Sequence, residues 1–147
     1  IDLLPTITAI TGAQLPTKTI DGKNAWSVFT GESKESPQEA YFFYYKVNEL
    51  HGVRYGDWKL YFPHTYNTLN GRKGGVNGIP VLYEKAKFSD ITLYNLRNDV
   101  GETIDVAKEN PEIVATILKL ADKMRDELGD TLQGKAKGTG SRPQKRK

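Results

Sequence analysis

The sequence predicts an α+β fold, with an antiparallel sheet of about four strands packed against a C-terminal helix. Aromatic residues alternate through residues 40–47, and a Gly-Asp turn at residues 56–57 joins two short apolar segments. Apolar residues then recur at helical spacing through residues 111–128. A period of two residues is typical of strands, whereas steps of three and four residues mark one face of a helix. We therefore expect the helix to pack on the sheet, with a partner-binding helix as the alternative.

Residues 1–39 are predicted to hold one short helix followed mostly by loop. Asp2 is suited to cap the start of this helix, and Gly12 to end it. The apolar side chains between them form a stripe that consists of Leu3, Leu4, Ile7 and Ile10. An isolated helix of this length is marginal in water, so the stripe needs a surface to pack against. Proline and glycine residues interrupt residues 13–39, which leave room only for a brief turn around residues 25–29.

Residues 40–47 and the hairpin that follows them carry the strongest strand signals. Aromatic residues occupy both faces of the first strand, which indicates that something packs on each side of it. Gly56 supplies the positive φ that a tight turn needs, which places strands near residues 51–55 and 58–62. The second of these strands has three apolar side chains on one face: Trp58, Leu60 and Phe62. Lys59 lies on the other face and is expected to point to solvent.

Residues 63–78 are predicted to be a long irregular segment, because glycine and asparagine are frequent there. A loop of this length in a compact domain is more often functional or mobile than an ordinary connection. Two further short strands are predicted at residues 79–84 and 91–96, followed by a turn at residues 97–102.

The C-terminal helix has the clearest predicted boundaries. Asn110 is a cap residue, Pro111 takes the first helical position, and Glu112 adds an acid to the first turn. Gly129 is expected to end the helix. Its apolar face consists of Ile113, Ile117, Leu120, Ala121, Met124 and Leu128. This face is the one that we expect to cover the sheet.

The composition is that of one globular domain, with 147 residues of which 37% are hydrophobic and 27% are charged. No apolar segment approaches the roughly 20 residues that cross a bilayer. The absence of cysteine excludes disulfides, thiolate metal sites and cysteine nucleophiles from this chain. The net charge of +3 is concentrated in residues 131–147, a basic tail that we expect to be disordered. This charge is too local to indicate nucleic-acid binding by the domain.

Short motifs follow one another along most of the chain. They are Leu4-Pro5-Thr6-Ile7, Ile20-Asp21-Gly22, the hairpin from Gly52 to Tyr61, Leu93-Tyr94-Asn95-Leu96, Asn98-Asp99 and Gly101-Glu102-Thr103. Their order and spacing resemble the C-terminal part of type I sulfatases, the arylsulfatase family. The similarity runs from about Asp2 to Leu128. The resemblance implies a parent enzyme that hydrolyses sulfate esters of aryl compounds or carbohydrates.

The resemblance also implies which chemistry this chain lacks. The family's nucleophile is a formylglycine made from Cys or Ser within Cys/Ser-x-Pro-x-Arg, whereas Ser141-Arg142-Pro143 has the wrong order. Asp99 has no second carboxylate at a spacing typical of a calcium site. We therefore expect no catalytic residue, no metal site and no turnover in this chain alone. Calcium and formylglycine are expected in a missing N-terminal domain.

The resemblance implies a division of the chain into three parts. Residues 1–39 are expected to be the remnant of the catalytic domain's end with a linker, residues 40–130 the sulfatase C-terminal domain, and residues 131–147 the basic tail. The expected partners are the missing N-terminal catalytic domain and a sulfated small molecule or glycan, with a homo-oligomer as a further option. No nucleic-acid or membrane partner is expected. Export to a periplasmic, secreted or lysosomal-like compartment is common in the family and is expected of the parent.

Three side chains are candidates for substrate binding. His64 can donate to a sulfate or shuttle a proton, and in relatives the loop after the matching strand borders the substrate pocket. Arg72 and Lys73 carry groups that bind anionic oxygens well. The alternatives are an exposed loop histidine and a solvated charge pair. His51 is expected to pack or cap, and the tyrosines either to stack on sugar rings or to pack in the core: Tyr41, Tyr44, Tyr45, Tyr61 and Tyr66.

Two other hypotheses remain open at this stage. The domain is alternatively a structural or oligomerisation domain with no direct substrate contact, built on the C-terminal helix or the exposed sheet. The third hypothesis is a free-standing basic binding module, and truncation of residues 134–147 tests it. Binding to heparin or nucleic acid that survives the truncation would show that the tail is not its cause.

Overall fold

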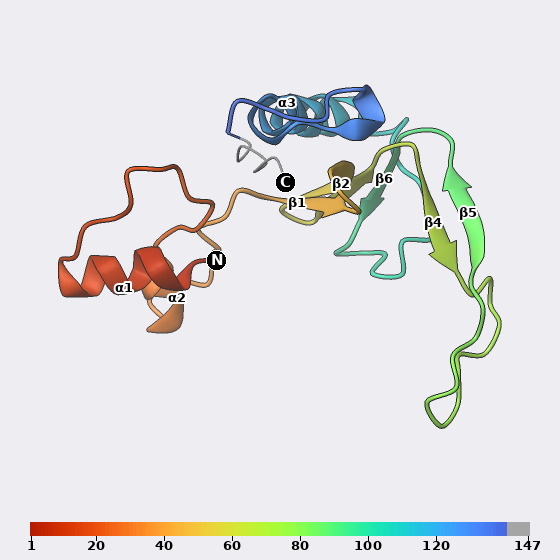
Figure 1. The fold of residues 1–147 in the computed structure, drawn as a ribbon, viewed down its shortest axis with the longest axis horizontal. Helices are drawn as coiled ribbons and strands as arrows, with labels where there is room; N and C mark the ends of the chain where they lie inside the picture. Colours follow the sequence, from red (N-terminus) through yellow and green to blue (C-terminus); the bar gives the residue numbers. More distant parts are fainter. Residues whose placement is uncertain (141–147) are drawn as a thin grey trace, which may run out of the picture. The chain divides into compact units, whose positions relative to one another are not determined.

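The computed structural model describes residues 1–140 and divides the chain into two compact units, residues 1–39 and the residues from 40 onward. The first unit holds helices α1 (Leu3–Thr11) and α2 (Trp26–Phe29). The strands all belong to the second unit (Figure 1): β1 (Ala40–Tyr45), β2 (Glu49–Tyr55), β3 (Trp58–Tyr61), β4 (His64–Thr68), β5 (Glu84–Phe88) and β6 (Thr92–Asn95). Helix α3 (Pro111–Leu128) and the 3₁₀ helix η1 (Thr131–Gln133) follow them. No helix within residues 1–140 has the length and apolarity that a membrane crossing requires.

Helix α1 buries threonine side chains rather than its apolar stripe. Thr6 and Thr8 are buried, whereas the stripe of leucine and isoleucine side chains predicted from the sequence is exposed. The Thr6 hydroxyl donates to the Asp2 carbonyl at 2.6 Å and accepts from the Ala25 backbone N–H at 2.9 Å. These bonds tie α1 to the start of α2 within the first unit.

The start of α1 differs from the prediction, because Asp2 does not cap the helix through its side chain. The Asp2 carboxylate instead accepts hydrogen bonds from the Lys23 backbone N–H at 2.8 Å and from the Gln38 side-chain amide at 2.6 Å. Gly12 ends the helix at a φ of 71°, as predicted. The Asp2 side chain is therefore used to hold the loop that follows α1.

The main sheet is antiparallel and has the strand order β1-β2-β3-β6. The β2–β3 hairpin turns at Gly56, whose φ is 57°, and pairs Tyr55 with Trp58. The α+β fold with a sheet of four strands and a C-terminal helix is confirmed. β1 is shorter than predicted and ends at Tyr45, because Lys46 adopts a φ of 51° and the chain turns there.

Two predicted segments beyond the main sheet were wrong. Residues 64–68 form β4 although the sequence indicated loop, and the strand expected at residues 79–84 begins only at Glu84 as β5. β4 and β5 pair antiparallel as a separate ribbon, and the loop of residues 69–83 projects beyond it (Figure 1). The apolar residues between 79 and 83 suggested a strand, yet Ile79, Leu82 and Tyr83 are exposed. Cross-strand pairing, which local composition does not reveal, selected the residues of this ribbon.

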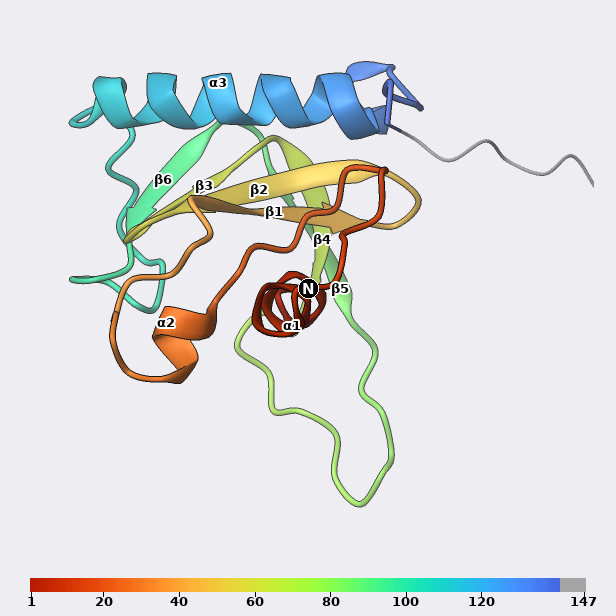
Figure 2. The same cartoon turned by 90° about the vertical axis from the view of Figure 1, so that its left-hand side faces the viewer.

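Helix α3 crosses one face of the main sheet (Figure 2). It spans residues 111–128 and begins with Pro111 as predicted, but Asn110 donates its side-chain amide to the Val106 carbonyl and does not cap the helix. Ile117 and Ala121 are fully buried against the sheet. The core consists of Leu50, Val53, Leu60, Phe62, Leu93, Ile117 and Ala121. Packing of the helix on the sheet is thus the interpretation that the structure supports.

The segment after α3 is ordered as far as the structure describes it. We expected residues 131–147 to be disordered, but residues 131–140 include η1 and several hydrogen bonds to the domain. The Thr131 N–H donates to the Asn48 carbonyl at 2.8 Å, and the Gly140 N–H donates to the Glu127 carbonyl at 2.8 Å. Residues 141–147, including Ser141-Arg142-Pro143, lie outside the described residues.

Candidate functional site

A cavity of about 280 Å³ lies on the second unit, over β1, the hairpin and the start of β4. Lys59 and Tyr61 alternate with the buried Leu60 along β3, and Leu60 packs in the same core as Ile117 of α3. Because side chains alternate across a strand, the cavity opens on the sheet face away from α3. Its lining consists of Tyr41, Phe42, Phe43, Tyr44, Tyr45, His51, Lys59, Tyr61 and His64.

The two histidines of the chain meet at this cavity. The rings of His51 and His64 stack with centroids 3.9 Å apart and planes inclined by 26°. His64 donates its Nδ1 proton to the Phe62 carbonyl at 2.7 Å, which leaves Nε2 as an acceptor in the neutral ring. Burial lowers the pKa of His64, and the neighbouring His51 ring adds to this effect. His64 is therefore neutral at pH 7.

His51 is held by a carboxylate on its own strand. Its Nε2 lies 2.8 Å from a carboxylate oxygen of Glu49, two residues away along β2. The hydrogen bond from His51 lowers the pKa of Glu49. His51 thus packs, as predicted from the sequence, and its ring stacks on that of His64.

A single carboxylate joins the polar groups of β3. Glu102, in the turn after β6, accepts from Lys59 Nζ at 2.6 Å through Oε1 and from the Tyr61 hydroxyl at 2.7 Å through Oε2. Lys59 Nζ also lies 5.1 Å from the Phe43 ring centroid and 4.8 Å from that of Tyr61. Such distances allow cation–π attraction. The expectation that Lys59 points freely to solvent was wrong, because only 18% of its side chain is exposed.

The charge of Lys59 is maintained despite partial burial. Burial on its own would lower the pKa of Lys59, but its hydrogen bonds with Glu102 and Tyr61 outweigh that effect and raise the pKa above its usual value. Burial raises the pKa of Tyr61, so its hydroxyl keeps a proton to donate. The cavity therefore presents one ammonium group, two imidazole rings, of which that of His64 is neutral, and aromatic faces.

Stacked rings connect the β4–β5 ribbon to the cavity. Tyr61 and Phe88 stack with centroids 5.0 Å apart, and Tyr66 and Phe88 stack at the same distance. His64 contacts the same Phe88 ring at 5.4 Å between centroids. The first residue of β4 is thus fixed by the last residue of β5, its partner in the ladder.

The structure separates the three substrate-binding candidates. His64 is buried and lines the cavity, but neither Arg72 nor Lys73 is among the described residues that line it. Arg72 fastens the loop instead, with its guanidinium 2.7 Å from the Leu82 carbonyl and 3.3 Å from Glu84. Lys73 is exposed in the same loop. A role in substrate binding stays a prediction for all three residues.

The sequence did not indicate that Lys59 lines the cavity or that Glu102 binds Lys59 there. The alternation of β3 places Lys59 on the same face as Tyr61, and this signal was available from the sequence. No comparable signal existed for Glu102, which reaches Lys59 across 43 residues of chain. Only the folded chain brings the two together.

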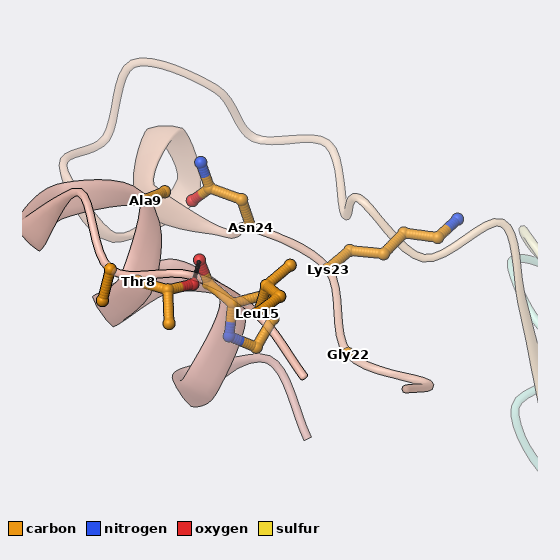
Figure 3. Close-up of a pocket in the computed structure, with 8 residues that line it drawn as sticks. Thr8, Ala9, Leu15, Gly22, Lys23 and Asn24 are labelled. Carbon is orange, nitrogen blue, oxygen red and sulfur yellow. Dashed lines mark hydrogen bonds between the residues drawn. The ribbon is translucent and has the colours of Figure 1, made fainter. Parts of the chain in front are cut away.

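The described residues outside this cavity include another cavity and no cluster of metal-binding side chains. No group of three or more histidine, aspartate or glutamate side chains within residues 1–140 is arranged to hold a metal ion. A second cavity of about 500 Å³ lies in the first unit beside Thr8, Leu15 and Asn24 (Figure 3). Its one charged side chain, Lys23, points away from Thr8 and Leu15.

Residues 36–143 match the family described as the C-terminal region of aryl-sulfatase. The chain belongs to this family. Arylsulfatase A of Homo sapiens is 30% identical over 131 residues, which cover 82% of this chain and 25% of the human protein. Arylsulfatase A of Bos taurus is 41% identical over 128 residues, which cover 84% of this chain and 25% of the bovine protein.

Further relatives agree with membership of the sulfatase C-terminal family. A sulfatase of Formosa agariphila is 29% identical over 131 residues, which cover 87% of this chain and 22% of that protein. A solved structure from work on glycosaminoglycan metabolism by Bacteroides thetaiotaomicron superposes with a TM-score of 0.59 at 21% identity, over 84% of this chain and 24% of that one. The chain thus has the fold of a sulfatase C-terminal domain and spans about a quarter of the length of these relatives.

Proposed function

We propose that this chain is the C-terminal part of a sulfatase that hydrolyses sulfate esters of aryl compounds or carbohydrates, and that its cavity forms one wall of the substrate pocket. Membership of the aryl-sulfatase C-terminal family supports the reaction class. The juxtaposition of Lys59 and His64 among aromatic side chains carries the assignment of the cavity.

The lining suits a sulfate ester attached to a ring. Lys59 stays charged at neutral pH, and an ammonium group binds anionic oxygens as a point charge with rotatable donors. Tyr41 and Tyr45, which are half exposed, offer faces for an aryl or sugar ring. His64, neutral at pH 7, accepts a hydrogen bond from a substrate hydroxyl through Nε2. The cavity therefore contributes orientation and charge rather than bond cleavage.

The reactive groups are proposed to come from the rest of the enzyme. In this family formylglycine supplies the nucleophile and calcium the electrophilic partner. The described residues of this chain do not fit a calcium site, since no cluster of carboxylates is present among them. This chain by itself is expected to cleave no aryl sulfate.

Alanine substitutions in the full-length enzyme test the proposal. We expect Lys59→Ala to lower kcat/KM for para-nitrophenyl sulfate by roughly tenfold or more, because a charged hydrogen-bond donor to the sulfate is lost. His64→Ala tests the second cavity group, and Arg72→Ala and Lys73→Ala test the loop. Lys119→Ala, an exposed lysine on α3, is the matched control. Unchanged kinetics in Lys59→Ala and His64→Ala would show that the cavity is not part of the substrate pocket.

A second function, association without substrate contact, has one observation in its favour. The loop of residues 69–83 exposes a group of apolar side chains: Val76, Ile79, Leu82 and Tyr83. Exposed apolar patches often mark interaction sites. Sedimentation of the full-length enzyme separates the two functions, because Leu82→Ser changes the assembly state only if this loop associates. Loss of assembly with unchanged kcat/KM would favour association.

A further inference from the structure

Glu102 does not line the cavity, but its side chain contacts two residues that do. Its carboxylate uses both oxygens, one for Lys59 and one for Tyr61, and these two side chains both line the cavity. Lys59 and Tyr61 are two residues apart on β3 and share a face. One carboxylate thus fixes two neighbouring side chains at the floor of the cavity without lining it.

The backbone of Glu102 is held in a conformation that is unfavourable for a residue with a side chain. Its φ is 56°, in the left-handed region that favours glycine. A glycine would adopt this conformation without strain, whereas a glutamate in it is uncommon. Such positions persist where the surrounding structure imposes them, and they concentrate at functional sites.

The turn around Glu102 is imposed by Asp99. The Asp99 carboxylate accepts from the Thr103 N–H at 2.7 Å and from the Ile104 N–H at 2.8 Å, and the Glu102 N–H donates to the Asp99 carbonyl at 3.2 Å. Hydrogen bonds from these N–H groups lower the pKa of Asp99. The turn is thus locked independently of the contacts that the Glu102 side chain makes with β3.

We propose that Glu102 is a positioning residue, which orients the Lys59 ammonium and the Tyr61 hydroxyl for the sulfate of the substrate. This inference rests on the proposed role of the cavity. Lys59 has four rotatable side-chain bonds, and its hydrogen bonds with Glu102 and Tyr61 use two of its three N–H donors, which leaves one donor for the substrate at a fixed place. Glu102 also helps to keep Lys59 protonated in a partly buried setting, because burial on its own lowers the pKa of Lys59 and the hydrogen bond with Glu102 opposes it.

Two substitutions in the full-length enzyme separate positioning from stability. Glu102→Gly removes the carboxylate and also the strain, so the midpoint of thermal unfolding is expected to stay within about 3 °C of wild type. The KM for para-nitrophenyl sulfate is expected to rise about tenfold with a smaller change in kcat, because a contact to the sulfate is weakened. Glu102→Gln keeps the shape of the side chain and removes only its charge.

The pH dependence of Glu102→Gln gives a signature that a structural role does not produce. We expect the alkaline limb of kcat/KM, where Lys59 loses its proton, to move to lower pH. The titratable groups that face Lys59 are Glu102 and Tyr61. Burial lowers the pKa of His64, so that residue affects the acid limb instead. Asp57→Asn, which breaks an exposed pair with Arg97 outside the cavity, is the control and should leave the profile unchanged.

The outcomes distinguish this inference from the proposed function. If Lys59→Ala raises KM but Glu102→Gly and Glu102→Gln keep wild-type KM and pH profiles, the positioning role is overturned and the cavity assignment stands. If Lys59→Ala itself has wild-type kinetics, the cavity assignment fails first. A double variant of Lys59→Ala with Glu102→Gly that is no worse than Lys59→Ala alone shows that Glu102 acts through Lys59.

Discussion

The neighbours of His64 include the Phe62 carbonyl, the His51 ring and the Phe88 ring. The two rings offer no hydrogen-bond acceptor comparable to water for a second proton on its imidazole. Burial lowers its pKa below the ordinary value of 6.5. The folded chain therefore binds a proton at His64 less readily than the unfolded chain does. At the residue scale, this side chain makes the cavity sensitive to acid, whereas Lys59 keeps its charge through Glu102.

Stability is expected to decrease as the pH falls below about 6.5, because the unfolded chain then takes up a proton that the folded chain resists. His64→Phe keeps a ring among its aromatic neighbours and removes the titration. We expect the free energy of unfolding in urea to fall less between pH 7.5 and pH 5.5 in this variant than in wild type. Equal losses in both proteins would place the titration elsewhere.

At the scale of elements, the end of α3 is joined to β2 through one buried carboxylate. Asp130 is fully buried, accepts from the Leu50 N–H at 3.2 Å and the Leu132 N–H at 3.0 Å, and pairs with Arg125 at 3.0 Å. Tyr44 donates to the neighbouring Gly129 carbonyl, and burial with the nearby Asp130 charge raises the pKa of Tyr44 to about 12. The segment after α3 is thereby part of the domain.

Asp130→Ala is expected to lower the free energy of unfolding by about 3 kcal/mol, because it leaves the Nε–H of Arg125 and two backbone N–H groups without their acceptor, while the Arg125 guanidinium keeps its pair with Asp122. Asp126→Ala is the control, since its pair with Lys135 is exposed and contributes less than about 1 kcal/mol. Urea denaturation at neutral pH measures both. Similar losses for the two variants would contradict the structural role of Asp130.

At the scale of the whole molecule, the two units bury different kinds of residue. Every residue of the core cluster comes from the second unit, and the first unit buries threonines within its own helix and loop. The family match likewise begins at residue 36, near the boundary between the units. The domain that carries the cavity therefore has a complete core of its own.

Removal of residues 1–39 is expected to leave residues 40–147 folded, with a cooperative urea transition whose midpoint is close to that of the whole chain. The physical reason is that the sheet, α3 and their core remain intact. Far-UV circular dichroism against urea concentration checks this. A broad, non-cooperative transition in the shortened chain would show that the first unit completes the domain.

The sequence alone determined the elements whose signal is local or periodic. Alternating aromatics placed β1, Gly56 placed the hairpin turn, and the apolar spacing between Pro111 and Gly129 placed α3 with Ile117 and Ala121 at the centre of its buried face. Val114 and Leu118, which the prediction left off this face, also pack against the core. The motifs along the chain were also sufficient to indicate the sulfatase family. These features depend on neighbours within a few residues, where backbone preferences and side-chain periodicity act directly.

Only the tertiary structure decided the ribbon and the cavity. β4 and β5 are strands because they pair with each other across a long loop, and Glu102 matters because a turn distant in sequence brings it to Lys59. For the same reason the Asp2 side chain accepts a hydrogen bond from the loop residue Lys23 and does not cap its own helix. Pairing and burial between distant segments depend on the whole chain, so residue order by itself does not encode them in any short pattern.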